Sequence, residues 1–146
     1  MIQVEVQYAA SSGDIPCENT FQSWAGKIEV ETTQEVALRI VDEAEMTQLN
    51  QQYRKKSGAT NVLSFPAEFP DGVDVPFLGD IIICAPVVAK EAADQGKSLD
   101  SHWAHMVVHG ILHLQGYDHI DDAEAEQMES LEIKIMHLLG FANPYV

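Results

Sequence analysis

Three histidines in the last third of the chain have the spacing of metal ligands. His109 and His113 lie four residues apart in the stretch HGILHLQGYDH, and His119 ends it. Residues four apart on a helix share one face, with Cβ atoms about 5–6 Å apart, so two imidazole nitrogens can converge on one zinc ion. His119 can join them only if the helix ends soon after Leu114 and the chain turns back. Gly116 stands where such a turn needs a glycine.

The pattern H-x3-H-x5-H matches the zinc site of metzincin-type proteases. Those enzymes carry a glutamate directly after the first histidine as the general base, and this chain has Gly110 at that position. Three histidine ligands leave a fourth position open, as in catalytic zinc sites. The sequence therefore predicts a zinc site on His109, His113 and His119. It argues against peptide hydrolysis, although a zinc peptidase or another hydrolase remains an alternative.

Other polar residues near these histidines have two interpretations. His105 lies four residues before His109, and His102 lies seven before it. Either one could contact the metal or orient a ligand, but a rigid helix spreads His105, His109 and His113 over about 12 Å, too far for one ion. We therefore interpret both as structural residues. Asp118 could orient a ligand histidine or could bond to its own loop.

A basic cluster provides a candidate group for binding substrate. Arg54, Lys55 and Lys56 stand together at the end of a predicted helix. A guanidinium beside a metal suits a phosphodiester, because it donates to two phosphoryl oxygens and stabilises charge in the transition state. The same cluster would also complement the dipole at the C-terminus of a helix. Ser64, on the strand that follows, could add a hydrogen bond.

Composition and charge limit the class of protein. The chain has 146 residues and is 46% hydrophobic, which predicts a single globular domain spanning 1–146. No apolar run approaches the roughly 20 residues of a membrane span, and the N-terminus does not resemble a signal peptide. We therefore expect a cytoplasmic protein without a membrane partner. Eight Lys and Arg against 23 Asp and Glu give a net charge of −15, which repels free nucleic acid at long range and argues against DNA as a partner.

Hydrophobic periodicity predicts a small mixed sheet with helices. Strands are expected at 2–8, 35–42, 60–65 and 78–85, and helices at 17–29, 43–54, 87–95, 99–115 and 122–139. This order of elements favours an α/β or α+β fold, with a four-stranded sheet and helices packed on it. The metal site would lie on a central helix and the loop that follows it.

Two details of the helices are also predicted. Gly58 is expected to break the helix at 43–54. In the last helix, the apolar stripe is expected to consist of Met128, Leu131, Ile135 and Leu138. The acidic run DDAEAEQMESLE at 121–132 is interpreted as a solvated face.

Three blocks of the sequence closely resemble the signature blocks of a known family, the YbeY family of bacterial endoribonucleases. They are HGILHLQGYDH at 109–119, LNQQYRKKSGATNVLSFP at 49–66 and LGDIII at 78–83. The resemblance extends over nearly the whole chain. Gly110, directly after the first histidine, separates the histidine block from those of the zinc proteases.

The resemblance implies a metal-dependent endoribonuclease specific for single-stranded RNA, acting in 3′-end maturation of small-subunit ribosomal RNA and in ribosome quality control. His109, His113 and His119 would hold one zinc ion. Arg54 would be the catalytic residue that faces the metal across a cleft and binds the scissile phosphate. The family's usual aspartate is Asn61 here, which would alter the charge of the cleft if that carboxylate anchors Arg54.

The net charge bears on the partners that the resemblance implies. A free ribonuclease with a charge of −15 should bind RNA weakly, because the cluster at 54–56 can hold only one or two phosphates. We therefore expect the small ribosomal subunit or its assembly proteins to deliver the RNA. A non-catalytic zinc-binding factor of ribosome biogenesis is the alternative from a different class.

Overall fold

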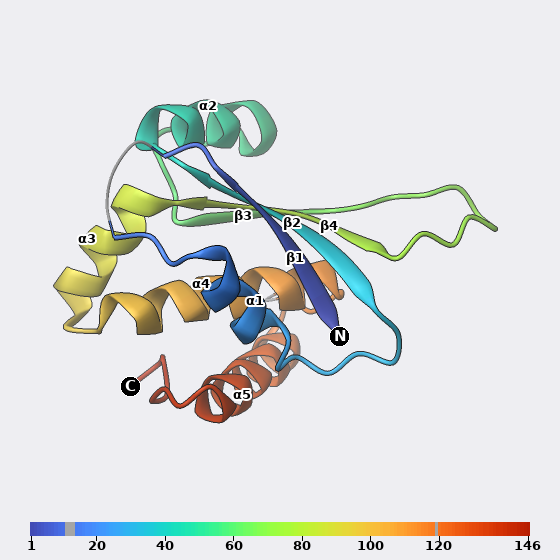
Figure 1. The fold of residues 1–146 in the computed structure, drawn as a ribbon. Helices are drawn as coiled ribbons and strands as arrows, with labels where there is room; N and C mark the ends of the chain where they lie inside the picture. The colour runs from blue at the N-terminus through green and yellow to red at the C-terminus, as the bar shows by residue number, and fades with distance from the viewer. Residues whose placement is uncertain (11–13, 119) are drawn as a thin grey trace.

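The computed structural model describes residues 1–10, 14–118 and 120–146, and His119 lies outside these described residues. Within them the strands are β1 (Ile2–Tyr8), β2 (Gln34–Val41), β3 (Val62–Pro66) and β4 (Phe77–Cys84). The helices are α1 (Glu18–Ala25), α2 (Glu43–Arg54), α3 (Ala85–Gln95), α4 (Leu99–Leu114) and α5 (Asp122–Leu138). The sheet lies between α2 on one side and α1, α4 and α5 on the other (Figure 1). The predicted mixed fold is confirmed.

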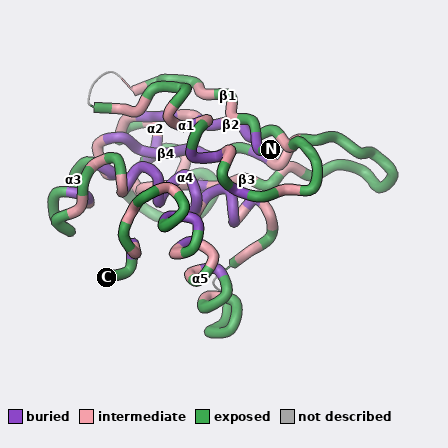
Figure 2. Tube along the Cα trace, turned by 60° about the horizontal axis from the view of Figure 1, so that its bottom comes forward, coloured by how far each residue is buried: buried purple, intermediate pink, exposed green. Residues whose placement is uncertain are grey.

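The sheet has the strand order β1-β2-β4-β3. β1, β2 and β4 run parallel, and β3 pairs antiparallel with β4 at one edge. One face carries Val36, Leu38 and Ile40 of β2 with Ile81 and Ile83 of β4, all buried in the main core. Buried positions concentrate in these strands and in α4 (Figure 2). No described helix has both the length and the apolar character of a membrane span.

The opposite face of the sheet is covered only in part. A second, smaller apolar cluster lies between this face and α2, and its buried members are Val41, Met46, Leu63, Ile82 and Cys84. Away from α2, the same face presents Glu5 of β1 and Asp80 of β4, which are both exposed. Ala37 of β2 pairs with both of these residues in the strand register. This half of the sheet is therefore open to solvent.

Helix α4 is the central element of the core. Its Ser98 cap accepts a hydrogen bond from the Ser101 amide at 3.1 Å, and Trp103 packs edge-on against Phe21 of α1 with ring centroids 5.7 Å apart. Gly116 has a φ of 103°, directly after the last turn. This backbone conformation is accessible to glycine at little cost, so the predicted chain turn after Leu114 is confirmed.

Gly110 allows α4 to lie close to the sheet. A Cβ atom at this position would stand 2.9 Å from Cγ2 and 3.0 Å from Cδ1 of Ile81 on β4. Both residues are buried in the core, so neither can move aside into solvent. The absence of a side chain at position 110 therefore sets the spacing between α4 and β4.

Two predictions about the helices were wrong. α2 ends at Arg54, before Gly58, because Lys55 adopts the left-handed conformation with a φ of 58°. In α5, Leu138 is 58% exposed, whereas Glu132 within the acidic run is fully buried. The apolar stripe of α5 is thus interrupted by one carboxylate, whose partners are described below.

We predict that Gly110→Ala lowers the free energy of unfolding. The added methyl group causes overpacking that costs about 1–3 kcal/mol, and the better helix propensity of alanine offsets about 1 kcal/mol. Urea unfolding would measure the difference. In an Ile81→Ala background the contact is gone, so Gly110→Ala should become neutral or stabilising there. An equal loss in both backgrounds would contradict the assigned contact.

Candidate functional site

His109 and His113 project from one face of α4 toward a common point. Their Nε2 atoms lie 3.1 Å apart, and their ring centroids are 4.6 Å apart. Two nitrogens bound to one tetrahedral zinc ion at about 2.0–2.1 Å stand roughly 3.3 Å apart. The two imidazoles are therefore already placed as a pair of metal ligands would be. The third predicted ligand, His119, lies outside the described residues.

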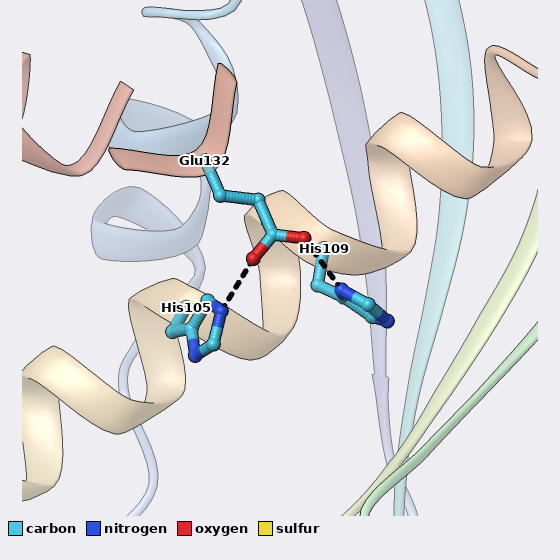
Figure 3. Close-up of side chains that lie close together, drawn as sticks. All are labelled: His105, His109 and Glu132. Atoms are coloured by element: carbon cyan, nitrogen blue, oxygen red, sulfur yellow. Dashed lines mark hydrogen bonds and ion pairs between the residues drawn. The ribbon is translucent and has the colours of Figure 1, made fainter. Parts of the chain in front are cut away.

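Glu132 of α5 is the fully buried carboxylate next to this pair. Its two oxygens lie 2.7 Å from Nε2 of His105 and 2.7 Å from Nδ1 of His109 (Figure 3). The Tyr145 hydroxyl donates a further hydrogen bond to it. Burial raises the pKa of Glu132, but the hydrogen bonds from His105, His109 and Tyr145 outweigh burial and lower it to about 2. Glu132 is therefore a charged acceptor.

The charge on Glu132 determines how the proton is placed on His109. A carboxylate only accepts hydrogen bonds, so Nδ1 of His109 must carry the proton that it donates. In a neutral imidazole the other nitrogen, Nε2, then has a lone pair, and this is the atom that faces His113. A histidine bound to metal is held by a carboxylate in the same way. The donor set thus fits a metal ion at the two Nε2 atoms.

His105, His109 and Glu132 are themselves close enough to hold a metal ion, since their ligand atoms all lie within 4.8 Å of one another. The contacts between them are hydrogen bonds of 2.7 Å, however, shorter than the spacing of two ligands on a tetrahedral ion. The geometry therefore favours a supporting role for Glu132 and His105. The interpretation of His105 as a structural residue misses its contact with the carboxylate that orients His109.

A second hydrogen-bond network lies nearer the start of α4. Nε2 of the buried His102 is 2.9 Å from Glu91 of α3, and the Asn61 amide donates to the same carboxylate at 3.1 Å. The Asn61 side-chain oxygen accepts from the Val62 amide at 2.7 Å. Asn61 thus joins the start of β3 to α3. Among the described residues it has no bond to Arg54.

Arg54 lines the same cleft as the histidine pair. The cleft has a volume of about 610 Å3 and runs along the edge strand β3, with Ser64 and Asn61 in its wall and His109 and His113 on its α4 side. The exposed Arg54 side chain makes no hydrogen bond or ion pair within the described ranges. The structure therefore brings three of the four predicted site residues to one cleft. Asp118 is exposed beside the undescribed position 119.

Gly110, which lies against the sheet, stands at the position that holds the general base in the zinc proteases. A side chain at residue 110 would point at Ile81, at 2.9 Å, and away from the histidine pair. A glutamate here would be buried against an apolar strand without a partner, which is costly. The fold therefore has no place for that base.

Sequence reasoning missed Glu132, Tyr145 and the contact between Asn61 and Glu91. A weak signal for Glu132 was available, because it lies four residues after Met128 and three before Ile135, which places it on the buried stripe. Tyr145 lies beyond the last helix, at a distance in sequence that no local pattern covers.

Comparisons with known proteins agree with this geometry. A family model described as Endoribonuclease YbeY matches residues 6–140. The chain is 54% identical to a Methylococcus capsulatus (strain Bath) protein named Endoribonuclease YbeY, over 99% of this chain and 96% of the relative. The solution structure of TM1509 from Thermotoga maritima is similar in fold, with a TM-score of 0.62 and 28% identity. That match covers 94% of this chain and 87% of the other.

We predict that Asn61→Asp destabilises the protein, and more so at pH 8 than at pH 5. The change replaces a hydrogen bond of 3.1 Å with two facing carboxylates, a loss of about 1–3 kcal/mol when both are charged. At the lower pH one carboxyl can take up a proton and the bond is partly restored. Urea unfolding at both values would measure the difference.

The matched control exchanges the two groups. Asn61→Asp combined with Glu91→Gln retains one amide and one carboxylate, so most of the stability should return. If the double variant were as unstable as Asn61→Asp alone, the Asn61–Glu91 contact would not be the cause.

Proposed function

The chain belongs to the YbeY family of endoribonucleases, and on that premise we propose that it is a metal-dependent endoribonuclease of the cytoplasm that cuts single-stranded RNA. We further propose that its substrate is the 3′ end of small-subunit ribosomal RNA, in maturation and in ribosome quality control. Residues 1–146 would act as one zinc-binding domain. The observation that carries the proposal is the cleft that holds Arg54 and the His109–His113 pair together.

His109, His113 and His119 are the proposed metal ligands, and zinc is the proposed ion. The first two are supported by the 3.1 Å spacing of their Nε2 atoms and by the carboxylate on Nδ1 of His109. His119 is supported by the chain turn at Gly116, which ends the helix before it. When bound, the ion supplies Lewis-acid chemistry toward a phosphoryl oxygen.

Arg54 is the proposed catalytic residue. Its side chain is exposed at the end of α2 and faces the cleft from the side opposite α4, so it can donate to two oxygens of a phosphodiester held there. Charge that develops on the phosphoryl group in the transition state strengthens those bonds. The described lining of the cleft includes the hydroxyls of Thr60 and Ser64 and no carboxylate. Side chains of this lining therefore bind and orient the RNA, and none of them is a carboxylate base.

The small ribosomal subunit, or proteins that assemble it, is the proposed partner that brings the RNA to the site. With a net charge of −15, the protein repels RNA at long range, and the cluster of Arg54, Lys55 and Lys56 is short. Substrate held on a subunit arrives at high local concentration, which offsets weak intrinsic binding.

We predict that Glu132→Gln weakens zinc binding by about 10- to 100-fold, because replacing the carboxylate that holds a ligand histidine typically has that effect. Glu91→Gln is the matched control, since it makes the same change at the other carboxylate that is bonded to a histidine of α4. Competition with a chelator would give both affinities. Tyr145→Phe, which removes only one donor to Glu132, provides a milder variant if Glu132→Gln unfolds. Equal zinc affinities in all four proteins would contradict the role of Glu132.

We predict that Arg54→Gln lowers kcat on a labelled 3′ fragment of small-subunit ribosomal RNA by roughly 10²- to 10³-fold while zinc content is unchanged. Lys56→Gln removes the same charge from the same cluster but does not line the cleft, so its effect should be much smaller. The salt dependence of binding should also become shallower for Arg54→Gln, by about 0.7 in the logarithmic slope for one lost phosphate contact.

Three preparations decide whether the activity belongs to this site: wild type, Arg54→Gln and His113→Ala. His113→Ala should lose both zinc and cleavage. If all three cut alike, the cleavage comes from a contaminant, and a non-catalytic zinc-binding role becomes the better explanation.

A further inference from the structure

A second cleft adjoins the one that holds Arg54. It lies on the open half of the sheet beside α2, has a volume of about 720 Å3, and includes Ala37 and Asp80 in its floor. That volume is within the range of about 300–1,000 Å3 that is usual for ligand sites. Tyr53 of α2 and Phe65 of β3 line both clefts. The two aromatic residues therefore form the boundary across which the clefts meet.

The boundary presents an aromatic surface to solvent. Tyr53 is 58% exposed, and its ring meets that of Phe65 edge-on with centroids 5.2 Å apart. Tyr53 also precedes Arg54 in the chain, in the last turn of α2. Whatever group lies against these rings is therefore next to whatever Arg54 binds.

Charge changes across this boundary. The cleft of the histidine pair carries Arg54, whereas the charged groups that line the sheet-face cleft are Glu5, Asp80 and Arg39. Arg39 is paired with Glu45 through two hydrogen bonds of 2.6 and 2.8 Å, so its charge is already neutralised. The sheet-face cleft is thus acidic and repels a phosphate. Its carboxylates can accept hydrogen bonds from the N–H groups of a base, as acidic side chains do with the cytosine amino group.

A nucleotide has the same asymmetry, with an anionic phosphate joined to a flat base that carries N–H donors. We propose that the sheet-face cleft is a nucleobase subsite, in which a base of single-stranded RNA stacks on Tyr53 beside Phe65 and its edge faces Asp80 and Glu5. The phosphate next to that base lies at Arg54. The subsite rests on the proposed function, because it places a base of the RNA whose phosphate the histidine cleft receives.

The test compares equilibrium binding and cleavage of short single-stranded RNAs by the zinc-loaded protein. The variants are Tyr53→Leu, which removes the ring, Tyr53→Phe, which keeps it, and Phe69→Leu, a control at an exposed aromatic residue that lines neither cleft. Stacking of one base typically contributes enough that its loss weakens binding by about 5- to 150-fold. We expect a loss in this range for Tyr53→Leu and wild-type affinity for the other two.

A matching change is made in the RNA, so that the base is removed instead of the Tyr53 ring. An abasic nucleotide is placed at each position in turn, and the loss for wild type is compared with the loss for Tyr53→Leu. At one position the abasic RNA should weaken binding to wild type and have no further effect on Tyr53→Leu, because the stacked base is already lost. Losses that add at every position, or an equal loss for Phe69→Leu, would overturn the subsite.

The two readouts separate this proposal from the proposed function. If wild type cuts RNA but Tyr53→Leu binds and cuts as wild type does, the subsite is wrong and the nuclease assignment stands. If no preparation cuts RNA but the abasic coupling to Tyr53 is observed, the subsite stands and the nuclease assignment is wrong.

Discussion

The buried Glu132 carboxylate is the interaction on which the arrangement of the site depends. A charge without exposure to water is costly unless it is fully hydrogen-bonded, and this one accepts from His105, His109 and Tyr145. The donors come from α4 and from the C-terminal segment, whereas the acceptor belongs to α5. Three separate parts of the chain are therefore held at one point. Lys97 donates to the Pro144 carbonyl and so also holds this C-terminal segment.

The same arrangement explains why histidines in similar positions on α4 have different roles. His102 and His105 are each bonded at Nε2 to a carboxylate from a neighbouring helix, and their buried Nδ1 atoms have no hydrogen-bond partner among the described residues. At His109 the order is reversed, because Nδ1 meets the carboxylate and Nε2 faces His113. What separates a candidate ligand from a structural histidine here is the direction of its second nitrogen. His109 and His113 line the cleft, whereas the Nδ1 atoms of His102 and His105 are buried.

The sequence was sufficient for the elements and for much of the site. Local periodicity placed each strand and helix within a few residues, and the i, i+4 spacing of His109 and His113 gave their shared face because helix geometry is local. Glu132 could not be assigned in this way, because an acidic residue inside an acidic run is indistinguishable from a solvated one until α5 is packed on α4. The bounds of α2 were predicted correctly, but the residue that ends it was not, because Lys55 takes a left-handed conformation that sequence rules reserve for glycine.

The distribution of charge limits how this protein can hold RNA. Most nucleic-acid binding draws on many phosphate contacts and the release of counterions, and that source is nearly absent from a chain with eight Lys and Arg. The basic cluster at the end of α2 lies beside one cleft, and the open sheet face next to it carries Glu5 and Asp80. In the proposed function and subsite, long-range attraction is replaced by short-range contacts, namely a forked guanidinium, a metal ion and aromatic stacking. Such contacts require a flexible strand that can enter the cleft, because in a duplex the faces of a base are stacked on its neighbours and its pairing edge is bonded to its partner. In that proposal the acidic surface favours single-stranded RNA, because it repels ligands that bind through their phosphate backbone alone.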